Sequence, residues 1–205
     1  KTVSLLNESG FSFNNCPNRL KADAHNFPAE ILYLRDDDIP QYVQDGVADI
    51  GIVGENVLVE KRKNIELIER LDFAKCRLSI AVAKSVEYTS TQFLQGKKIA
   101  TSYPIIVQKF LDQHGVKADI HEISGSVEIA PGIGLADAIC DIVSTGSTLL
   151  GNGLKEVETV MKSEAVLVSG QSLSSEKQQI QNRLFYRYNS DKAAKINKNQ
   201  IQNAQ

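Results

Sequence analysis

The chain has 205 residues, of which 42% are hydrophobic, and its 23 Lys and Arg residues against 25 Asp and Glu residues give a formal net charge of −2. This length suits one large domain or two small lobes, and the apolar content places the chain outside the disordered class. A nearly neutral balance provides no general field that would attract nucleic acid or an anionic membrane surface, so nucleic-acid binding is disfavoured as the main activity.

The first half of the chain alternates short apolar runs with short amphipathic segments. Such alternation with brief connections predicts an α/β architecture, with parallel sheets covered by helices. Residues 36–38 (DDD) can cap the start of one of these helices. We expect strands over 31–35, 48–53, 65–71 and 77–83, and helices over 39–45 and 55–61.

The second half continues the pattern. We expect helices over 91–94, 105–113 and 134–140, and strands over 98–101, 116–123, 141–144 and 165–168. Ser174 or Ser175 then caps a long helix in which Ile180, Leu184 and Tyr188 recur every four residues. The amide-rich segment 197–205 has too little apolar content to pack strongly, so we interpret it as a frayed tail.

Cysteine usage and hydropathy indicate the compartment. Cys16, Cys76 and Cys140 are an odd number without a CxxC pair, which excludes a disulfide framework and a cysteine-rich zinc site and fits a reducing compartment. We expect Cys76 and Cys140 to be buried and inert. No apolar run approaches the ~18 residues that span a bilayer, and the first residues lack the features of a signal peptide. We therefore expect a cytoplasmic protein without membrane contact.

Residues 128–149 are the segment richest in chemistry. A predicted strand, 141–144, runs directly into residues 145–148 (TGST). A strand that breaks into Ser, Thr and Gly residues and then opens a helix presents N–H groups and hydroxyls that suit a phosphate. Gly146 would let the backbone approach that phosphate, and Asp141 could accept hydrogen bonds from sugar hydroxyls. The alternative is a simple turn and helix cap, and without a GK[ST] sequence the segment is no Walker motif.

Several segments, in one order along nearly the whole chain, resemble the ATP phosphoribosyltransferase family, which begins histidine biosynthesis. One runs from Glu128 through Asp141 to TGSTL at 145–149. The others are RDDDIP (35–40), DGVADIGIVG (45–54), ENVL (55–58), LDF (71–73), CRLS (76–79), ATSYP (100–104) and NGLKEV (152–157).

The resemblance implies a two-lobed α/β fold of the periplasmic-binding-protein type II class, with the active site in the cleft between the lobes. Lobe I would comprise residues 1–79 and 165–205, and lobe II residues 80–164 with the phosphoribosyl pyrophosphate loop. The implied reaction joins N1 of the adenine of ATP to C1 of phosphoribosyl pyrophosphate and releases pyrophosphate. The resemblance also implies Mg²⁺ as cofactor, with no protein ligand assigned to it, and a homo-oligomer for the intact enzyme.

Site residues are assigned by their match to the family's motifs. No catalytic residue is assigned, because the leaving group is already a stable anion and catalysis rests on positioning and charge neutralisation rather than on a strong base. The expected phosphoribosyl pyrophosphate-binding residues are Glu128, Asp141, Ser144, Thr145, Gly146, Ser147 and Thr148. The expected nucleotide or cleft residues are Asp37, Gly51, Gly54, Thr101, Ser102 and Tyr103.

The sequence also departs from the family's pattern. Members usually open with a strand and a Lys-x-Gly-Arg-Leu turn, whereas this chain opens at residues 1–6, which resemble the following helix. Arg commonly follows the proline of EIAP, where this chain has Gly132, and the lost cation would weaken substrate affinity or turnover. The sequence motifs of the first lobe resemble those of the family's long form, whose histidine-sensing C-terminal domain would begin where this chain stops. The alternatives are a two-lobed small-molecule-binding protein and an engineered or truncated inactive fragment.

Overall fold

The computed structural model describes residues 1–14, 19–170 and 173–182. Cys16, Leu184, Tyr188 and the amide-rich segment 197–205 lie outside the described residues. The chain divides into two compact units, of which the first takes Lys1–Val53, Lys63–Arg70 and Val166–Gln205, and the second takes Gly54–Arg62 and Leu71–Ala165. The lobe boundaries expected from the family resemblance stay a prediction.

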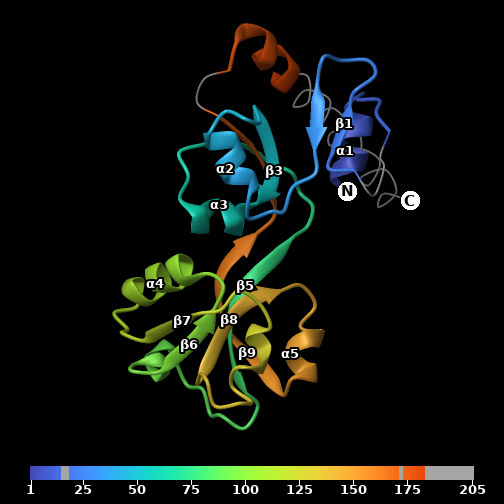
Figure 1. The fold of residues 1–205 in the computed structure, drawn as a ribbon. Helices are drawn as coiled ribbons and strands as arrows, with labels where there is room; N and C mark the ends of the chain where they lie inside the picture. Colours follow the sequence, from blue (N-terminus) through green and yellow to red (C-terminus); the bar gives the residue numbers. More distant parts are fainter. Residues whose placement is uncertain (15–18, 171–172, 183–205) are drawn as a thin grey trace, which may run out of the picture. The chain divides into compact units, whose positions relative to one another are not determined.

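The first unit contains two small sheets. Its elements are α1 (Thr2–Glu8), β1 (Lys21–Asp23), β2 (Glu30–Leu32), α2 (Ile39–Gln44), β3 (Ile50–Gly54), β4 (Glu66–Arg70) and β10 (Ala165–Ser169). Strands β1 and β2 pair antiparallel, and β10 lies between β3 and β4 (Figure 1). Helix α2 packs closely on β3, because a Cβ built on Gly51 would lie 2.7 Å from Cγ2 of Ile39. Residues 175–182 are helical, with the Ser174 hydroxyl accepting the N–H of Lys177, as the sequence predicted.

The second unit is built on a five-stranded sheet. Its elements are α3 (Glu55–Lys61), β5 (Cys76–Ala83), η1 (Thr91–Leu94), β6 (Lys98–Thr101), α4 (Pro104–Gln113), β7 (Asp119–Glu122), η2 (Val127–Ile129), β8 (Ala138–Val143), α5 (Ser147–Gly151) and β9 (Leu154–Ser163). The strand order is β7-β6-β8-β5-β9 (Figure 1). Strand β6 runs parallel to β7 and β8, whereas β5 runs antiparallel to β8 and β9. The α/β class is therefore confirmed, although this sheet is mixed rather than parallel.

The two faces of this sheet carry separate apolar clusters. Leu78, Ile80 and Val82 of β5 belong to the larger cluster, which also contains buried residues of α4. Ala81 of β5 and Ile139 of β8 belong to the smaller cluster, together with Leu149 of α5. Because side chains alternate along a strand, the odd-numbered residues of β5 and β8 share the second face. That face also holds the polar residues described below.

One predicted element is wrong, and one strand was missed. The helix expected over 134–140 is a turn followed by β8: Gly134 has a φ of +73°, which no right-handed helix accommodates, and residues from Ala138 onward form ladder pairs with β5. Strand β9 was not predicted at all. It is an edge strand whose charged residues, in LKEVETVMKS, hide the apolar alternation, and its pairing with β5 is interrupted by two irregularities.

Candidate functional site

The segment that follows β8 is an exposed polar loop held at both ends by buried residues. Ser144, Thr145, Ser147 and Thr148 are exposed, while Val143 before them and Leu149 after them are buried. The hydroxyl oxygens of Thr145 and Ser147 lie 3.0 Å apart, and the N–H of Ser147 points to Oγ1 of Thr145 at 3.5 Å. The loop therefore exposes four hydroxyl-bearing residues within one short segment.

Gly146 has a structural reason to be glycine. It stands at the N-cap of α5 with a φ of +81°, in the left-handed region that a side chain disfavours. A Cβ there would meet only Cγ1 of Val143, at 4.0 Å, so the requirement comes from the backbone conformation rather than from lack of space. The position lies directly against the end of β8.

Asp141 lies in β8 beside Ser79 of β5, its direct cross-strand partner. Its Oδ1 accepts the N–H of Ile142 at 2.7 Å. Burial raises the pKa of Asp141, and the negative charge of Glu128 raises it further, whereas the Ile142 N–H opposes both effects. Glu128 lies in η2 and is half-buried. The structure thus brings two of the predicted site carboxylates close enough to repel each other.

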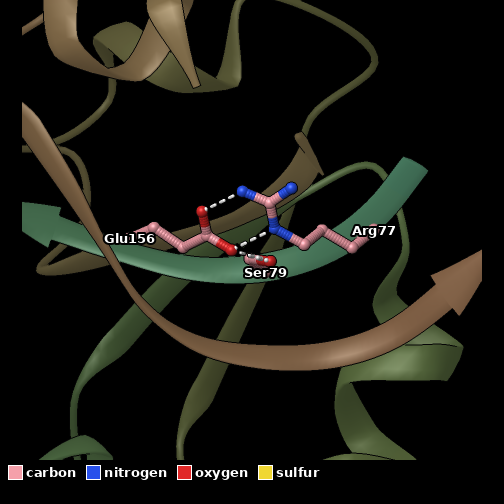
Figure 2. A network of polar contacts seen from close by, with 3 residues as sticks. All are labelled: Arg77, Ser79 and Glu156. Carbon is pink, nitrogen blue, oxygen red and sulfur yellow. Dashed lines mark hydrogen bonds and ion pairs between the residues drawn. The ribbon is translucent and has the colours of Figure 1, made fainter. Parts of the chain in front are cut away.

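A three-residue network on β5 and β9 was missed by the sequence analysis. Arg77 donates to both carboxylate oxygens of Glu156, from Nε to Oε1 at 2.5 Å and from Nη2 to Oε2 at 2.6 Å, and Ser79 donates its hydroxyl to Oε1 at 2.7 Å (Figure 2). The Arg77 hydrogen bond holds the pKa of Glu156 below its usual range, against the opposing effect of burial. The network joins β5 to β9.

The segment from Thr101 to Tyr103, predicted to lie near the nucleotide, is fixed by hydrogen bonds. Oγ1 of the buried Thr101 accepts the N–H of Tyr103 at 2.9 Å, and Ser102 donates its hydroxyl to the carbonyl of Ile123. The Tyr103 hydroxyl accepts a hydrogen bond from Nδ2 of Asn56 at 3.2 Å.

Asn56 is in turn held by the end of β9. It is buried in α3, where its Oδ1 accepts the hydroxyl of the buried Ser163 at 2.8 Å and its backbone N–H donates to the same hydroxyl oxygen at 3.0 Å. The neighbouring Gly54 caps α3, and a Cβ at Gly54 would lie only 2.5 Å from the Asn56 side-chain oxygen. Packing therefore already explains this glycine and also Gly51.

The remaining predictions concern Asp37, the acidic cap of α2 and the two described cysteines. Asp37 is exposed in the turn before α2, in the first unit. Asp38 is the N-cap of α2 but makes no side-chain capping hydrogen bond, so the predicted acidic cap is wrong in detail. Cys140 is buried and Cys76 is half-buried. Burial raises the pKa of both thiols, which disfavours the reactive thiolate.

Metal-binding clusters and membrane-spanning helices are both absent from the described residues. Within them no group of three or more His, Cys, Asp or Glu side chains is arranged to hold a metal ion. In the same part of the chain no helix is long and apolar enough to cross a membrane.

Comparison with known proteins gives consistent results. The sequence profile of the family described as HisG, ATP phosphoribosyltransferase, matches residues 35–187. An ATP phosphoribosyltransferase of Cytophaga hutchinsonii is 57% identical over 198 residues, which are 97% of this chain and 69% of that protein. The solved ATP phosphoribosyl transferase (HisG:HisZ) complex from Thermotoga maritima superimposes with a TM-score of 0.76 at 26% identity, covering 92% of each chain.

The fold is also shared with proteins of another kind. The substrate binding protein of an amino acid ABC transporter superimposes with a TM-score of 0.58, covering 78% of this chain and 72% of its own. At 12% identity this likeness shows the fold alone. The predicted periplasmic-binding-protein-like fold class is therefore confirmed.

Proposed function

The chain belongs to the ATP phosphoribosyltransferase family, and from this premise we propose that the loop of residues 144–148, with Asp141 and Glu128, binds phosphoribosyl pyrophosphate. The family's enzyme condenses ATP with phosphoribosyl pyrophosphate to give phosphoribosyl-ATP and pyrophosphate, the first step of histidine biosynthesis. One observation carries the proposal for the site: a loop of exposed hydroxyls directly follows the strand that holds Asp141, and both belong to the second unit.

The parts of this site suit the parts of the substrate. The hydroxyls of Ser144, Thr145, Ser147 and Thr148 and the loop's N–H groups would hold the 5′-phosphate. Asp141 would accept hydrogen bonds from the ribose hydroxyls, because a buried hydroxyl without a partner costs about 1–3 kcal/mol. Glu128 would share this role, since its charge acts on Asp141.

The nucleotide end of the reaction is a second proposal. Within the second unit, Thr101, Ser102, Tyr103 and Gly54 would line the nucleotide side. Asp37 and Gly51 are separate candidates for nucleotide binding in the first unit. The hydrogen bonds that fix Thr101, Ser102 and Tyr103 support a rigid surface there, which positioning requires. The adenine N1 attacks a carbon with oxocarbenium character, so this surface needs to orient the base rather than to remove a proton.

Mg²⁺ is the proposed metal, and the available oxygen donors fit it. Asp141 and Glu128 offer hard carboxylate oxygens, and Mg²⁺ commonly binds through one or two carboxylates together with substrate phosphates and water. When bound, the ion would neutralise charge on the departing pyrophosphate. The carboxylates' own part is to hold the ribose.

Assembly and compartment complete the proposal. The Thermotoga maritima structure is a complex of two kinds of chain, which supports assembly with further subunits, and we expect a homo-oligomer for the intact enzyme. We expect the cytoplasm as its compartment.

The direct test follows the absorbance of phosphoribosyl-ATP formed from ATP, phosphoribosyl pyrophosphate and Mg²⁺. Thr148→Ala removes one loop hydroxyl, and Gly146→Val forces a side chain into a left-handed backbone position. Both variants should bind phosphoribosyl pyrophosphate more weakly in calorimetry while keeping the circular dichroism of the fold. Thr89→Ala, at an exposed threonine of the same unit, is the control. Unchanged affinity in both loop variants would contradict the site.

A further inference from the structure

Arg77 lies on the same face of the sheet as the proposed substrate residues. Its direct partner across the ladder is Val143, the last residue of β8 before the loop, and the next pair on this face is Ser79 with Asp141. Direct cross-strand partners point to the same side of a sheet, with Cβ atoms about 4.5–5.5 Å apart. A Cβ at Gly146 would reach Val143 at 4.0 Å, which places the loop against the strand beside Arg77.

The guanidinium of Arg77 is held in one orientation. Nε and Nη2 each donate to one carboxylate oxygen of Glu156, so the ion pair is bidentate. The hydroxyl of Ser79 donates to the same carboxylate and fixes its position. The third nitrogen, Nη1, makes no hydrogen bond to the described residues and points away from Glu156 in Figure 2. The Arg77 side chain keeps 35% of its surface exposed, so a ligand can reach part of it.

The charge of this face calls for a cation. Asp141 and Glu128 repel each other, Glu156 adds a third carboxylate, and residues 144–148 contain no Lys or Arg. Gly132 contributes no side chain either. Lys162 of β9, the direct partner of Arg77, adds a second cation to this face, but Arg77 is the one whose partner in β8 adjoins the loop, so it can attract the phosphate groups of the substrate there. Arginine suits that role because its planar fork can bind two groups at once.

We propose that Arg77 is a further substrate-binding residue, whose outer guanidinium edge binds phosphate oxygens of phosphoribosyl pyrophosphate. Glu156 and Ser79 are then positioning residues, which hold Arg77 and make no contact with substrate. The inference rests on the proposed site at residues 144–148. It differs from the purely structural interpretation, in which the pair only fastens β5 to β9.

A double-mutant cycle separates the two interpretations. Arg77→Gln, Glu156→Gln and the double variant are compared by calorimetry with phosphoribosyl pyrophosphate and, separately, with ATP, and thermal melts report folding. If Arg77 binds phosphoribosyl pyrophosphate, Arg77→Gln should raise the Kd for phosphoribosyl pyrophosphate at least tenfold and leave the Kd for ATP within twofold of wild type. The double variant should stay as weak as Arg77→Gln, and Arg77→Lys, which keeps the charge, should recover part of the affinity.

The purely structural interpretation predicts the opposite result for the double variant. Two neutral amides can pair with each other, so the double variant would regain wild-type stability and wild-type affinity, and that result overturns the proposal. Unchanged affinity in Arg77→Gln overturns it as well. If Arg77→Gln does not fold, Arg77→Lys decides: affinity equal to that of wild type at a lowered melting temperature overturns the proposal, and weaker affinity supports it.

Two further measurements locate the effect. Titration with ribose 5-phosphate and with inorganic pyrophosphate shows which phosphate group Arg77 contacts, because only that ligand should lose affinity in Arg77→Gln; loss for neither overturns the proposal. Thr148→Ala distinguishes the inference from its premise. Weak binding in Thr148→Ala with normal binding in Arg77→Gln leaves the loop site standing and refutes only the role of Arg77. A wild-type chain that binds no phosphoribosyl pyrophosphate refutes both.

Discussion

Glu60 is a buried carboxylate that starts a helix other than its own. It lies in the last turn of α3 and only 8% of its surface is exposed. Its Oε1 accepts the N–H of Ile105 at 2.9 Å and its Oε2 accepts the N–H of Ile106 at 3.0 Å. Helix α4 begins at Pro104, which has no N–H, so these two groups are the first donors of the helix. A negative charge there also suits the helix dipole.

Removing this carboxylate should have a measurable cost. Glu60→Ala leaves two N–H groups without their partner, at about 1–3 kcal/mol for each buried group. Ile106 is buried and Ile105 is half-buried, so water can satisfy part of the loss at Ile105. The expected loss of unfolding free energy is therefore about 2–4 kcal/mol, which corresponds to a fall in Tm of roughly 4–16 °C for a chain of this size.

Thermal melts followed by circular dichroism test this reasoning. Glu60→Gln keeps one acceptor oxygen and should lose less stability than Glu60→Ala. Glu87→Ala, at an exposed glutamate in the connection after β5, should change Tm by less than about 2 °C, as surface substitutions usually do. Because α4 follows directly on Tyr103, we also expect Glu60→Ala to weaken ATP binding. A Glu60→Ala variant that melts with the Glu87→Ala control would refute the assignment of Glu60 as the cap of α4.

Two further predictions concern the substrate site. Burial and the charge of Glu128 raise the pKa of Asp141, so the ionised side chain destabilises the fold above that pKa, and this destabilisation fades as pH falls through it. Asp141→Asn should therefore raise Tm at pH 7 and raise it progressively less at lower pH, as thermal melts across pH would show. The same variant should lower the rate of phosphoribosyl transfer in rate assays. Gly132 does not have a positive φ, and a Cβ built on it would meet only the carbonyl oxygen of Ile129, at 3.5 Å, so a side chain fits there. Gly132→Arg should therefore fold normally and lower the KM for phosphoribosyl pyrophosphate, whereas Gly132→Glu should raise this KM. Equal KM values in the two variants would contradict a phosphate near this position.

Local patterns predicted those elements whose limits are local. Helix α3 begins after Gly54 and ends before Arg62, which has a left-handed φ of +48°, and the sequence predicted its bounds. Strand β6 was predicted with equal accuracy because Gly96 precedes it and Pro104 starts the next helix. The turn at Gly134 was mistaken for helix because its small residues, GLADA, are also compatible with a helix. Only pairing with β5 and β6, which lie 56 and 39 residues earlier at Val82 and Ile99, makes Ala138 the start of a strand.

The same distinction applies to the site. The loop at 144–148 could be predicted, because its strand, its hydroxyls and its glycine are consecutive in the sequence. The partnership of Arg77 with Glu156 spans 79 residues, and that of Glu60 with α4 spans about 45. Neither spacing has a recognisable motif, and a charged residue on a short helix usually faces solvent. The first pair becomes visible only once the ladder brings β9 against β5, and the second only once α3 packs against α4.

The two faces of β5 and β8 separate stability from chemistry within single strands. Leu78 and Ile80 are fully buried in the larger apolar cluster, so their substitution would damage the core. Arg77 and Ser79 alternate with them and point to the face that holds Asp141. On that face a carboxylate is kept half-buried beside another, which costs folding free energy. A fold arranged only for stability would not place charge there, whereas a site for a sugar phosphate requires it, and the apolar side of the same strands supplies the stability that offsets it.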